Sequence, residues 1–554
     1  MKICLVHGYP LTGTGSNIYV ANLAIKLCAL GHDVSIMCQE PHPENLDFVS
    51  EAYTFNETNT GYERKFQKQT SLKGACRIFR PRLNTLLVFV PDKYEGFSVV
   101  QTLHESSQSD IEEFAQKNAS ALRLIIKDFN IEIIQANHSV MQPYIAHLAT
   151  RENNIPYFAT LHGSALNFSV RKSEFLHKCA MEGVRHAKKV IAVSGHNARE
   201  FREYLKEKHD KLPADITVIP VGVDLDKFEL LTNKKSACVS RLKENLEKKL
   251  KILNHGKTKA LKQDLEKRIA QATPSVKIKE LFRDIAKNYD RRHPDHDVVE
   301  TLDGIDWAND KIVLFVGKYL WTKGLQVVIT AIPMILKKIP EARFVFVGFG
   351  ESREILQALV FALARGDKEL YQYMLKAHSQ IDLGGAIDTP LIENGFLDKL
   401  KKQDALEAFF NDAKESRIDE RVHFTGIMSH DELRFMLPMA DVLVAPSVFP
   451  EAFGTVAIEA MAAGVFPIIS YQYGFKEVDD AITEGISEDL GDLAHMPKMY
   501  IDNRMASTLA ENVIAVLRSE NVRSKAFKQK CRDLATKNYS WDAVAQKYLE
   551  VFSS

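Results

Sequence analysis

The chain has 554 residues, 45% of them hydrophobic, and its 72 Lys and Arg residues balance 72 Asp and Glu residues. This length predicts two or three domains of a soluble globular protein, and the zero net charge argues against nucleic acid as the main partner. The seven cysteines show no CxxC spacing, which fits a reducing compartment. We therefore expect a cytoplasmic protein.

The N-terminal segment Lys2–His7 is apolar but too short for a signal peptide, and it is typical of a first β-strand. A glycine-rich stretch with Gly13, Gly15 and Asn17 follows, and then a helical pattern and a second strand. A strand–loop–helix–strand unit predicts a parallel sheet. The glycine spacing does not match the dinucleotide fingerprint. The glycines would let a backbone approach a ligand; the alternative is a plain tight turn.

Two later strands end in histidine. Residues 131–138 close with His138, and residues 155–164 contain His162 near their end. The carboxyl ends of parallel strands line the crevice in which open α/β sheets bind ligands, so both histidines are site candidates. The alternative for His138 is a loop residue that caps a strand end. No run is long enough to cross a bilayer, although peripheral membrane contact stays open.

The segment 216–224 contains Pro220 and Gly222 and predicts a fixed turn between two domains. Asp224 and Asp226 imitate a metal motif, but their position after this turn favours a helix cap.

Residues 229–309 are charged and carry leucines at helical spacing, which predicts a helical hairpin with one apolar stripe per helix. A solvated accessory hairpin is the simplest interpretation; a lid, an oligomer contact or an acceptor-side surface are the alternatives. Within it, we expect His293–Asp297 to form an exposed loop rather than a metal site. Residues 351–420 are also largely helical in pattern, with a possible break at Gly384 and Gly385.

A second strand–loop–helix series begins at residue 311. Lys318 follows its first strand, and Lys323 and Gly324 lie in the loop before an apolar helix that ends near Leu336. Farther on, Ser429 and Glu432 form a predicted capping box.

The most informative stretch surrounds Glu451 and Glu459. It reads as a strand to residue 447, a short loop, a helix over 454–464 and a strand over 465–470. A helix N-terminus offers N–H donors and a positive dipole end to a phosphate, and carboxylates on either side can accept hydrogen bonds from sugar hydroxyls. Phosphate flanked by hydroxyl-bearing groups describes a nucleotide sugar. The backbone N–H groups in question belong to Phe453, Gly454, Thr455 and Val456.

The Glu-x7-Glu pattern, with Gly-Thr-x-x-x-Glu-Ala-Met-Ala-x-Gly inside it, resembles the donor motif of retaining GT-B glycosyltransferases, in particular glycosyltransferase family 4 (glycosyltransferase group 1). The resemblance implies an α/β fold with two Rossmann-like domains that face a central cleft. The expected acceptor domain is 1–222 with the terminal helix 538–554, and the expected donor domain is 310–537. Residues 229–309 are then a helical insertion. The alternative for the motif is a buried Ala-rich helix with two unrelated glutamates.

The resemblance further implies retaining transfer of a hexosyl group from a nucleotide sugar, with UDP favoured, to an unknown hydroxyl acceptor such as a sugar, a lipid or a small metabolite. It requires neither a metal nor a cofactor. Lys318 stands where the family usually has Arg, so the charge is kept but the bidentate geometry is not. The implied catalytic residues are His162, Glu451 and Lys323. The implied donor-binding residues are Gly13, Gly15, Asn17, His138, Lys318, Lys323, Phe453, Gly454, Thr455, Val456 and Glu459.

Two other functions stay open at this point. A nucleotide-sugar 2-epimerase of the same fold would use carboxylates and a His for proton transfer, and the Gly-Thr-x-x-x-Glu string fits it poorly. A catalytically inactive GT-B protein that serves as a scaffold or binding protein is disfavoured because the implied site residues occur together.

Overall fold

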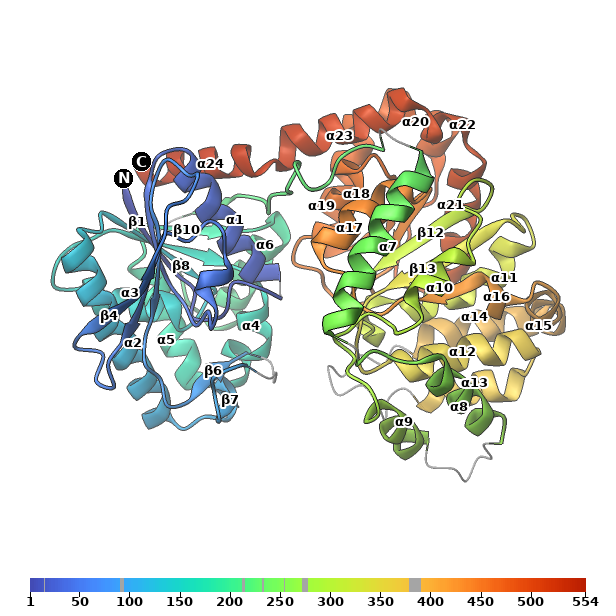
Figure 1. The fold of residues 1–554 in the computed structure, drawn as a ribbon, viewed down its shortest axis with the longest axis horizontal. Helices are drawn as coiled ribbons and strands as arrows, with labels where there is room; N and C mark the ends of the chain where they lie inside the picture. The colour runs from blue at the N-terminus through green and yellow to red at the C-terminus, as the bar shows by residue number, and fades with distance from the viewer. Residues whose placement is uncertain are drawn as a thin grey trace. The chain divides into compact units, whose positions relative to one another are not determined.

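A computed structural model describes residues 1–13, 15–89, 94–211, 215–231, 234–253, 255–271, 278–377 and 390–554. These residues form two compact units: residues 1–222 with 539–554 make unit 1, and residues 223–538 make unit 2. In each unit helices flank a central sheet (Figure 1). The predicted α/β class with two parallel-sheet units is confirmed. The possible helix break at Gly384 and Gly385 lies outside the described residues.

The main sheet of unit 1 has the order β11-β10-β9-β8-β1-β2-β5-β3-β4, in which only the β3–β4 pair is antiparallel among the described pairings. Its central strands are buried almost throughout, as expected of parallel strands covered on both faces. The strands are β1 (Lys2–Val6), β2 (Asp33–Met37), β3 (Glu51–Phe55), β4 (Tyr62–Gln67), β5 (Cys76–Arg80), β8 (Ile133–Asn137), β9 (Tyr157–Leu161), β10 (Lys189–Ala192) and β11 (Ile216–Val218), with β6 (Leu86–Val88) and β7 (Val100–Thr102) as a separate pair.

The last helix of the chain packs on the first helix of unit 1 (Figure 1). The Tyr548 hydroxyl meets the buried Tyr19 hydroxyl, and the Trp541 ring leaves no room for a Cβ at Gly222. The terminal helix therefore belongs to the core of unit 1. The helices of this unit are α1 (Gly15–Ala29), α2 (Gln108–Phe129), α3 (Gln142–Thr150), α4 (Ser164–Phe168), α5 (Glu174–Arg185), α6 (Gly195–Glu207) and α24 (Trp541–Ser553).

The sheet of unit 2 is parallel, with the order β14-β13-β12-β15-β16. Helix α11, predicted from an apolar run, is buried on nearly every side, which explains why its sequence is hydrophobic all round. The strands are β12 (Lys311–Val316), β13 (Ala342–Val347), β14 (Val422–Phe424), β15 (Val442–Ala445) and β16 (Pro467–Ile469).

The helices of unit 2 confirm one predicted cap and correct another. The capping box of Ser429 and Glu432 is present at the start of α17. Asp224 accepts hydrogen bonds from the backbone N–H groups of Asp226 and Lys227, but residues 225–227 form a turn and the next helix begins only at Lys235. The predicted helix cap is therefore wrong, and Asp224 instead stabilises a turn. The helices are α7 (Lys235–Ile252), α8 (Lys259–Ala270), α9 (Ile278–Ala286), α10 (Val298–Asp303), α11 (Leu325–Leu336), α12 (Arg353–Arg365), α13 (Lys368–Ala377), α14 (Pro390–Lys402), α15 (Leu406–Glu415), α16 (Ile418–Arg421), α17 (His430–Met436), α18 (Thr455–Ala462), α19 (Tyr473–Gly485), α20 (Ser487–Leu490), α21 (Met505–Arg518), α22 (Glu520–Arg523) and α23 (Lys525–Tyr539).

Two predictions for residues 229–309 are wrong. The segment is not a hairpin whose helices pair with each other: α7 packs on α10 and α17, and α8 packs on α9 and α12. The segment His293–Asp297 is not an exposed loop either, because Pro294 and Asp295 are buried. The predicted apolar stripes are present in part: Leu242, Leu246, Leu265 and Ile269 are buried, whereas Leu253 follows the end of α7 and is exposed.

Each of the seven cysteines lies in the described part of the chain and is free, and all but Cys238 are buried. Among the described residues, no helix combines the length and the apolar character needed to span a bilayer.

Candidate functional site

The order of the strands locates a candidate site in each unit. In the sheet of unit 1, β2 is the neighbour of β1 on one side, and β8, which comes later in the chain, is its neighbour on the other side. In unit 2, β12 and β15 are related in the same way. Loops that follow two such strands diverge, and open α/β sheets bind ligands at this point.

In unit 1, the loop after β1 carries the predicted glycines. Gly13 has a φ of +95°, which favours glycine. A Cβ added at Gly13 or Gly15 would meet no atom within 4 Å. The loop is held by the buried Glu40 carboxylate, which accepts a hydrogen bond of 2.9 Å from the Leu11 N–H. The backbone at both glycines is therefore open to a ligand while the loop itself is anchored.

Asn17 is occupied at both ends of its amide. Its Nδ2 donates to the Thr12 carbonyl at 2.6 Å, and its Oδ1 lies 2.9 Å from Nε2 of the buried His7. Because Oδ1 can only accept, His7 carries its proton on Nε2. Asn17 thus ties the glycine-rich loop to the end of β1. The sequence predicts that Asn17 contacts the donor directly, whereas in the structure both ends of its amide are engaged within unit 1.

His162 follows β9 and is held by Asn137 at the end of β8. Asn137 Nδ2 donates to the Val6 carbonyl at 3.2 Å, so its Oδ1 accepts from His162 Nε2 at 2.9 Å. This bond fixes the tautomer: Nε2 is protonated and Nδ1 carries the lone pair. Tyr19 stands edge-on to the same ring. His162 therefore presents a hydrogen-bond acceptor of fixed orientation.

His138 is the least satisfied side chain of this region. Its φ is +72°, an uncommon value outside glycine, and it is 1% exposed. Neither ring nitrogen has a hydrogen-bond partner among the described residues, and the same holds for Nδ1 of His7. Its ring centroid lies 5.0 Å from that of His162 and 5.7 Å from that of His7. Strained, unsatisfied buried groups often mark a ligand site.

The three histidines of unit 1 are neutral near pH 7. Burial lowers the pKa of His7 to about 4, and burial together with the neighbouring His7 lowers the pKa of His162 to about 3. Burial, and then the two neighbouring histidines, hold the pKa of His138 well below its ordinary value. The cluster therefore offers hydrogen bonds but no positive charge.

In unit 2, the loops after β12 and β15 are fastened to each other. A Cβ on Gly324 would fall 1.8 Å from the Pro446 carbonyl oxygen, and Gly324 has a φ of +75°. Val448 N–H donates to the Thr322 carbonyl at 2.9 Å. Only glycine permits this approach, so the Lys323–Gly324 pair recognised in the sequence is needed to join the two loops.

Lys323 and Glu451, predicted from separate motifs, form an ion pair. Lys323 Nζ lies 2.5 Å from Glu451 Oε1, and the side chains are 34% and 19% exposed. The Ser447 hydroxyl lies 2.8 Å from the same carboxylate oxygen. The two loops thus present a cation and an anion side by side, both still accessible.

The N-terminus of α18 opens next to Glu451 in the chain. Gly454 precedes the helix with a φ of +109°, and no side chain caps it. Thr455 and Val456 are half-exposed, and first-turn amides have no acceptor within their own helix. At the other end Gly464 has a φ of +73°, with bonds from Val465 N–H to Ala460 and from Gly464 N–H to Met461, so the predicted glycine stop is confirmed.

Glu459 on α18 is almost buried, at 7% exposure, and its Oε1 lies 3.4 Å from Nε2 of His430 on α17. Burial lowers the pKa of His430, but the hydrogen bond and the charge of Glu459 outweigh it and leave that pKa raised. Phe453, by contrast, is a buried apolar side chain and can offer a ligand only its backbone.

Lys318 is exposed in the loop after β12, and its Nζ lies 5.9 Å from the centroid of the Phe349 ring.

Several supporting residues were missed from the sequence. Asn137, Ser447 and His430 each orient a predicted site residue. Asn137 and Ser447 follow the apolar runs of β8 and β15, and a polar residue at such a strand end was the available signal. His430 follows a predicted cap, where nothing in the sequence indicates a partner.

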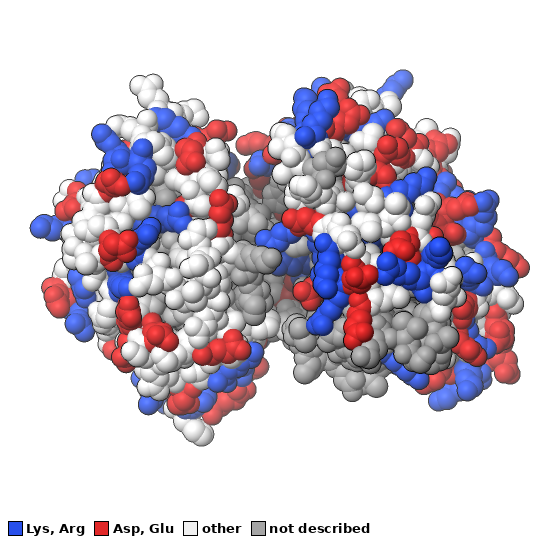
Figure 2. Space-filling model, turned by 60° about the horizontal axis from the view of Figure 1, so that its bottom comes forward, with Lys and Arg blue, Asp and Glu red and all other residues white. Residues whose placement is uncertain are grey.

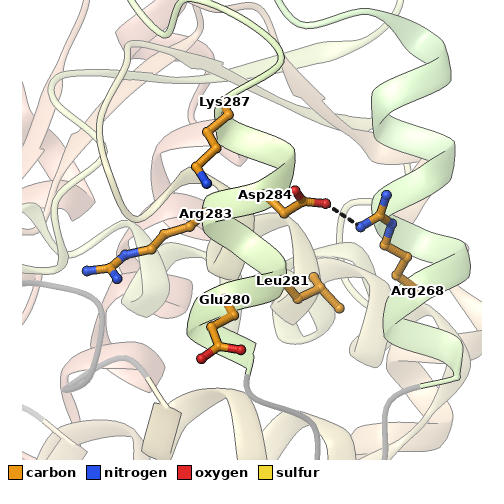
Figure 3. Close-up of a pocket in the computed structure, with 6 residues that line it drawn as sticks. All are labelled: Arg268, Glu280, Leu281, Arg283, Asp284 and Lys287. Carbon is orange, nitrogen blue, oxygen red and sulfur yellow. Dashed lines mark hydrogen bonds and ion pairs between the residues drawn. The ribbon is translucent and has the colours of Figure 1, made fainter.

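A hollow of about 500 Å³ lies between α8 and α9, outside the strand ends (Figure 3). Its lining is mostly charged, and Arg268 pairs with Asp284 across it at 2.7 Å. Sites for small organic ligands are usually apolar with a few polar groups, so this hollow does not compete with the strand ends.

One histidine–carboxylate group could offer metal ligands among the described residues: His147, Glu182 and His186. It lies near the end of α5, and the Gly183 carbonyl of that helix meets Tyr157 at the start of β9. The group therefore lies at the opposite edge of the sheet from the candidate site of unit 1. On the face drawn in Figure 2, acidic and basic side chains alternate among the described residues.

Two family models match the chain. The glycosyl transferases group 1 model matches residues 305–381 and 395–532, and the glycosyltransferase family 4 model matches residues 91–227. The first range contains Lys318, Lys323, Glu451 and Glu459. Residues 228–304 lie between the two matched ranges.

Several curated relatives have glycosyltransferase names. An uncharacterized glycosyltransferase of Methanocaldococcus jannaschii is 25% identical over 244 residues, which is 44% of this chain and 45% of that protein. The phosphatidyl-myo-inositol mannosyltransferase of Mycobacterium tuberculosis is 23% identical over 285 residues, 49% of this chain and 58% of that protein. The chain spans about half the length of these relatives.

Solved structures resemble the whole chain. Sucrose-phosphate synthase from Thermosynechococcus elongatus has a TM-score of 0.54 at 17% identity and covers 100% of this chain and 98% of its own. Anabaena HepE in complex with UDP has a TM-score of 0.53 at 13% identity, with both chains covered fully. At these identities the likeness establishes the fold.

Proposed function

The chain belongs to the glycosyl transferases group 1, with the GT-B fold, and from this premise we propose that it transfers a hexosyl group from a nucleotide sugar to a hydroxyl acceptor, with retention of the anomeric configuration. The acceptor class stays open between sugars, lipids and small metabolites.

The observation that carries this proposal is the Lys323–Glu451 pair beside the uncapped start of α18. A nucleotide sugar needs cations and N–H donors for its diphosphate and an acceptor for its sugar hydroxyls, and this region of unit 2 offers all three. An accessible ion pair contributes only about 0–1 kcal/mol. A diphosphate can therefore draw Lys323 away from Glu451 at little cost and leave the carboxylate for the sugar.

In the proposed reaction, the bond from the anomeric carbon to the phosphate oxygen breaks through an oxocarbenium-like state, and negative charge grows on the leaving phosphate. Lys323, Lys318 and the amides of Gly454 and Thr455 stabilise that charge. The acceptor oxygen forms the new bond to the anomeric carbon, and its proton leaves with the phosphate. Glu451 orients the sugar ring, and Glu459 accepts bonds from the ribose hydroxyls.

We assign the acceptor side, together with part of the sugar, to unit 1. His162 accepts a hydrogen bond at Nδ1 because Asn137 occupies Nε2. Nδ1 of His7 and one ring nitrogen of His138 provide further acceptors, and the other nitrogen of His138 is a donor. Since these rings are neutral, they position hydroxyl groups and do not act as general acids.

UDP is the favoured nucleotide. Structures of Anabaena HepE with UDP and with UDP-glucose share this fold, which makes a UDP-sugar the first donor to test.

The first experiment is a thermal-shift and calorimetry panel of UDP, GDP and ADP with their sugar derivatives on the full chain. A specific ligand raises the unfolding temperature by mass action. Slow hydrolysis of the donor that binds then serves as the activity assay, since it needs no knowledge of the acceptor.

Glu451→Gln should lower donor hydrolysis about 100-fold or more while the fold is retained. Glu484→Gln is the matched control, because Glu484 is exposed on α19 in the same unit. If wild-type protein ignored every nucleotide, or if Glu451→Gln hydrolysed the donor at the wild-type rate, the proposal would be refuted.

A further inference from the structure

The inserted segment Asp290–Asp297 runs along the carboxyl edge of the sheet of unit 2. Pro294 forms an isolated bridge with Gly426, just past the end of β14, and Asp295 N–H donates to the Thr425 carbonyl at 2.9 Å. A Cβ on Gly426 would lie 2.6 Å from Asp295 N, and its φ is +74°. The insertion therefore reaches the edge of the sheet at which the donor site lies.

Buried charges fix this segment in place. Asp295, fully buried, lies 2.5 Å from Arg353 and 2.9 Å from Lys262. Lys257 and Glu354, also fully buried, pair at 3.1 Å. Removing one partner of such a network leaves an uncompensated buried charge, which is strongly destabilising. The segment is thus part of the body of unit 2 rather than a detachable lid.

Arg292, within this segment, and Lys318 both lie near the aromatic ring of Phe349. The Arg292 guanidinium carbon lies 6.0 Å from the centroid of Phe349, and Lys318 Nζ lies 5.9 Å from the same centroid. Phe349 follows β13, and the loop that carries it packs on the loop after β12: a Cβ on Gly350 would lie 2.4 Å from the Tyr319 carbonyl oxygen. Arg292 from the inserted segment and Lys318 from the loop after β12 therefore converge on one side chain.

We propose that Arg292 is a donor-binding residue that supplies the guanidinium for the diphosphate of the nucleotide sugar. This inference rests on the proposed function. Lys318 stands at the position where the family usually has Arg, and an ammonium group cannot form the paired, planar contact that a guanidinium makes with a phosphate. The insertion restores that group from outside the family pattern, since residues 228–304 lie between the ranges that the family models match.

Binding of UDP, UMP and uridine to the full chain tests the proposal. Arg292→Gln should weaken UDP binding about 10-fold, weaken UMP less, and leave uridine unchanged, because the lost contact is with phosphate. Arg292→Lys should recover part of the UDP affinity. Arg283→Gln is the matched control: it removes an exposed arginine from α9 of the same insertion and should change nothing. GDP or ADP replaces UDP if the nucleotide panel favours one of them.

The outcomes separate this inference from the proposed function. If Arg292→Gln bound UDP as wild type does while Lys323→Gln lost affinity, Arg292 would not be a phosphate ligand and the donor site would stand. An equal loss for UDP and uridine would point to a structural role and would overturn the proposal as well. If neither wild type nor any variant bound a nucleoside diphosphate, the proposed function itself would fall.

Discussion

The loops at the carboxyl ends of the strands carry different chemical groups in the two units. In unit 1, the neutral rings of His7, His138 and His162 lie close to Asn137, and all of these residues are buried except His162, which is half-buried. In unit 2, Lys323 and Glu451 meet as an accessible ion pair beside the open end of α18. The topology is the same, since each region lies where the strand order reverses. The shared fold therefore supplies only the location, and the residues in the loops decide what is bound.

The difference is what a transfer from a nucleotide sugar requires. A leaving diphosphate needs positive charge that is already in place, whereas a hydroxyl group needs hydrogen-bond acceptors of fixed orientation. Burial removes charge from the histidines of unit 1, whereas Lys323 of unit 2 is partly exposed and pairs with Glu451.

The largest loss should follow from removing the charge of Lys323. Lys323→Gln keeps the length of the side chain but cannot neutralise a developing negative charge, so we expect donor hydrolysis to fall about 100-fold or more. The full chain is assayed at saturating donor. Lys338→Gln, at an exposed position after α11, is the control and should retain the wild-type rate. Equal rates for both variants would show that the charge is not used.

A smaller loss should follow at His162. His162→Gln can still donate to Asn137 but loses the acceptor at Nδ1, so we expect transfer to fall about 10- to 100-fold, as for a lost buried hydrogen bond of 1–3 kcal/mol. The unfolding temperature should change little.

Asn137→Asp provides the sharper test of the same assignment. A carboxylate 2.9 Å from Nε2 would raise the pKa of His162, and the protonated ring could no longer accept at Nδ1. Activity of this variant should therefore decline as the pH falls, and the pH–activity profile of the wild type should lack this decline. A wild-type profile would contradict the assigned tautomer.

Much of the fold was readable because local signals agreed with it. The apolar run of α11, the capping box at Ser429 and the glycine stop at Gly464 each act within a few residues. The Glu-x7-Glu pattern indicated Glu451 as a site residue, and the Lys–Gly pair indicated Lys323. What no local pattern indicated was that Lys323 and Glu451 touch, since 128 residues separate them.

The insertion shows where such reasoning fails. His293–Asp297 is polar in composition and was expected to be exposed, yet Asp295 is buried because Arg353 and Lys262 compensate its charge. Those partners come from other elements, so burial depended on a tertiary pairing. Polar composition predicts exposure only when no such partner exists.

Unit 1 should also be the more sensitive unit to acid. The folded-state pKa values of His7 and His162, about 4 and about 3, lie below the ordinary 6.5. The unfolded chain therefore binds more protons, and stability from these groups is lost as the pH falls from 6.5 toward 4, by at most about 1.4 kcal/mol per group and pH unit. Hydrogen exchange of β1, β8 and β9 amides measures this for unit 1 alone. His162→Gln should make the dependence shallower; an unchanged slope would contradict a neutral His162.

The smallest effect should appear at His430, and with the opposite sign. Burial lowers the pKa of His430, but the hydrogen bond to Glu459 and the charge of that carboxylate outweigh burial and leave the pKa raised. Lys227 lowers this pKa and Asp224 raises it, and Lys227 itself pairs with Asp431. The stability that protonated His430 gives the folded chain is fully present below its ordinary pKa of 6.5. It is lost as the pH rises through the raised pKa of the folded state. Glu459 then loses its orienting partner, so the KM for the nucleotide sugar should rise a few-fold, on the scale of about 1 kcal/mol for a partly exposed pair, while kcat holds. His430→Gln should give a flat KM across the same range. If wild type and this variant share one KM profile, Glu459 is oriented by a residue other than His430.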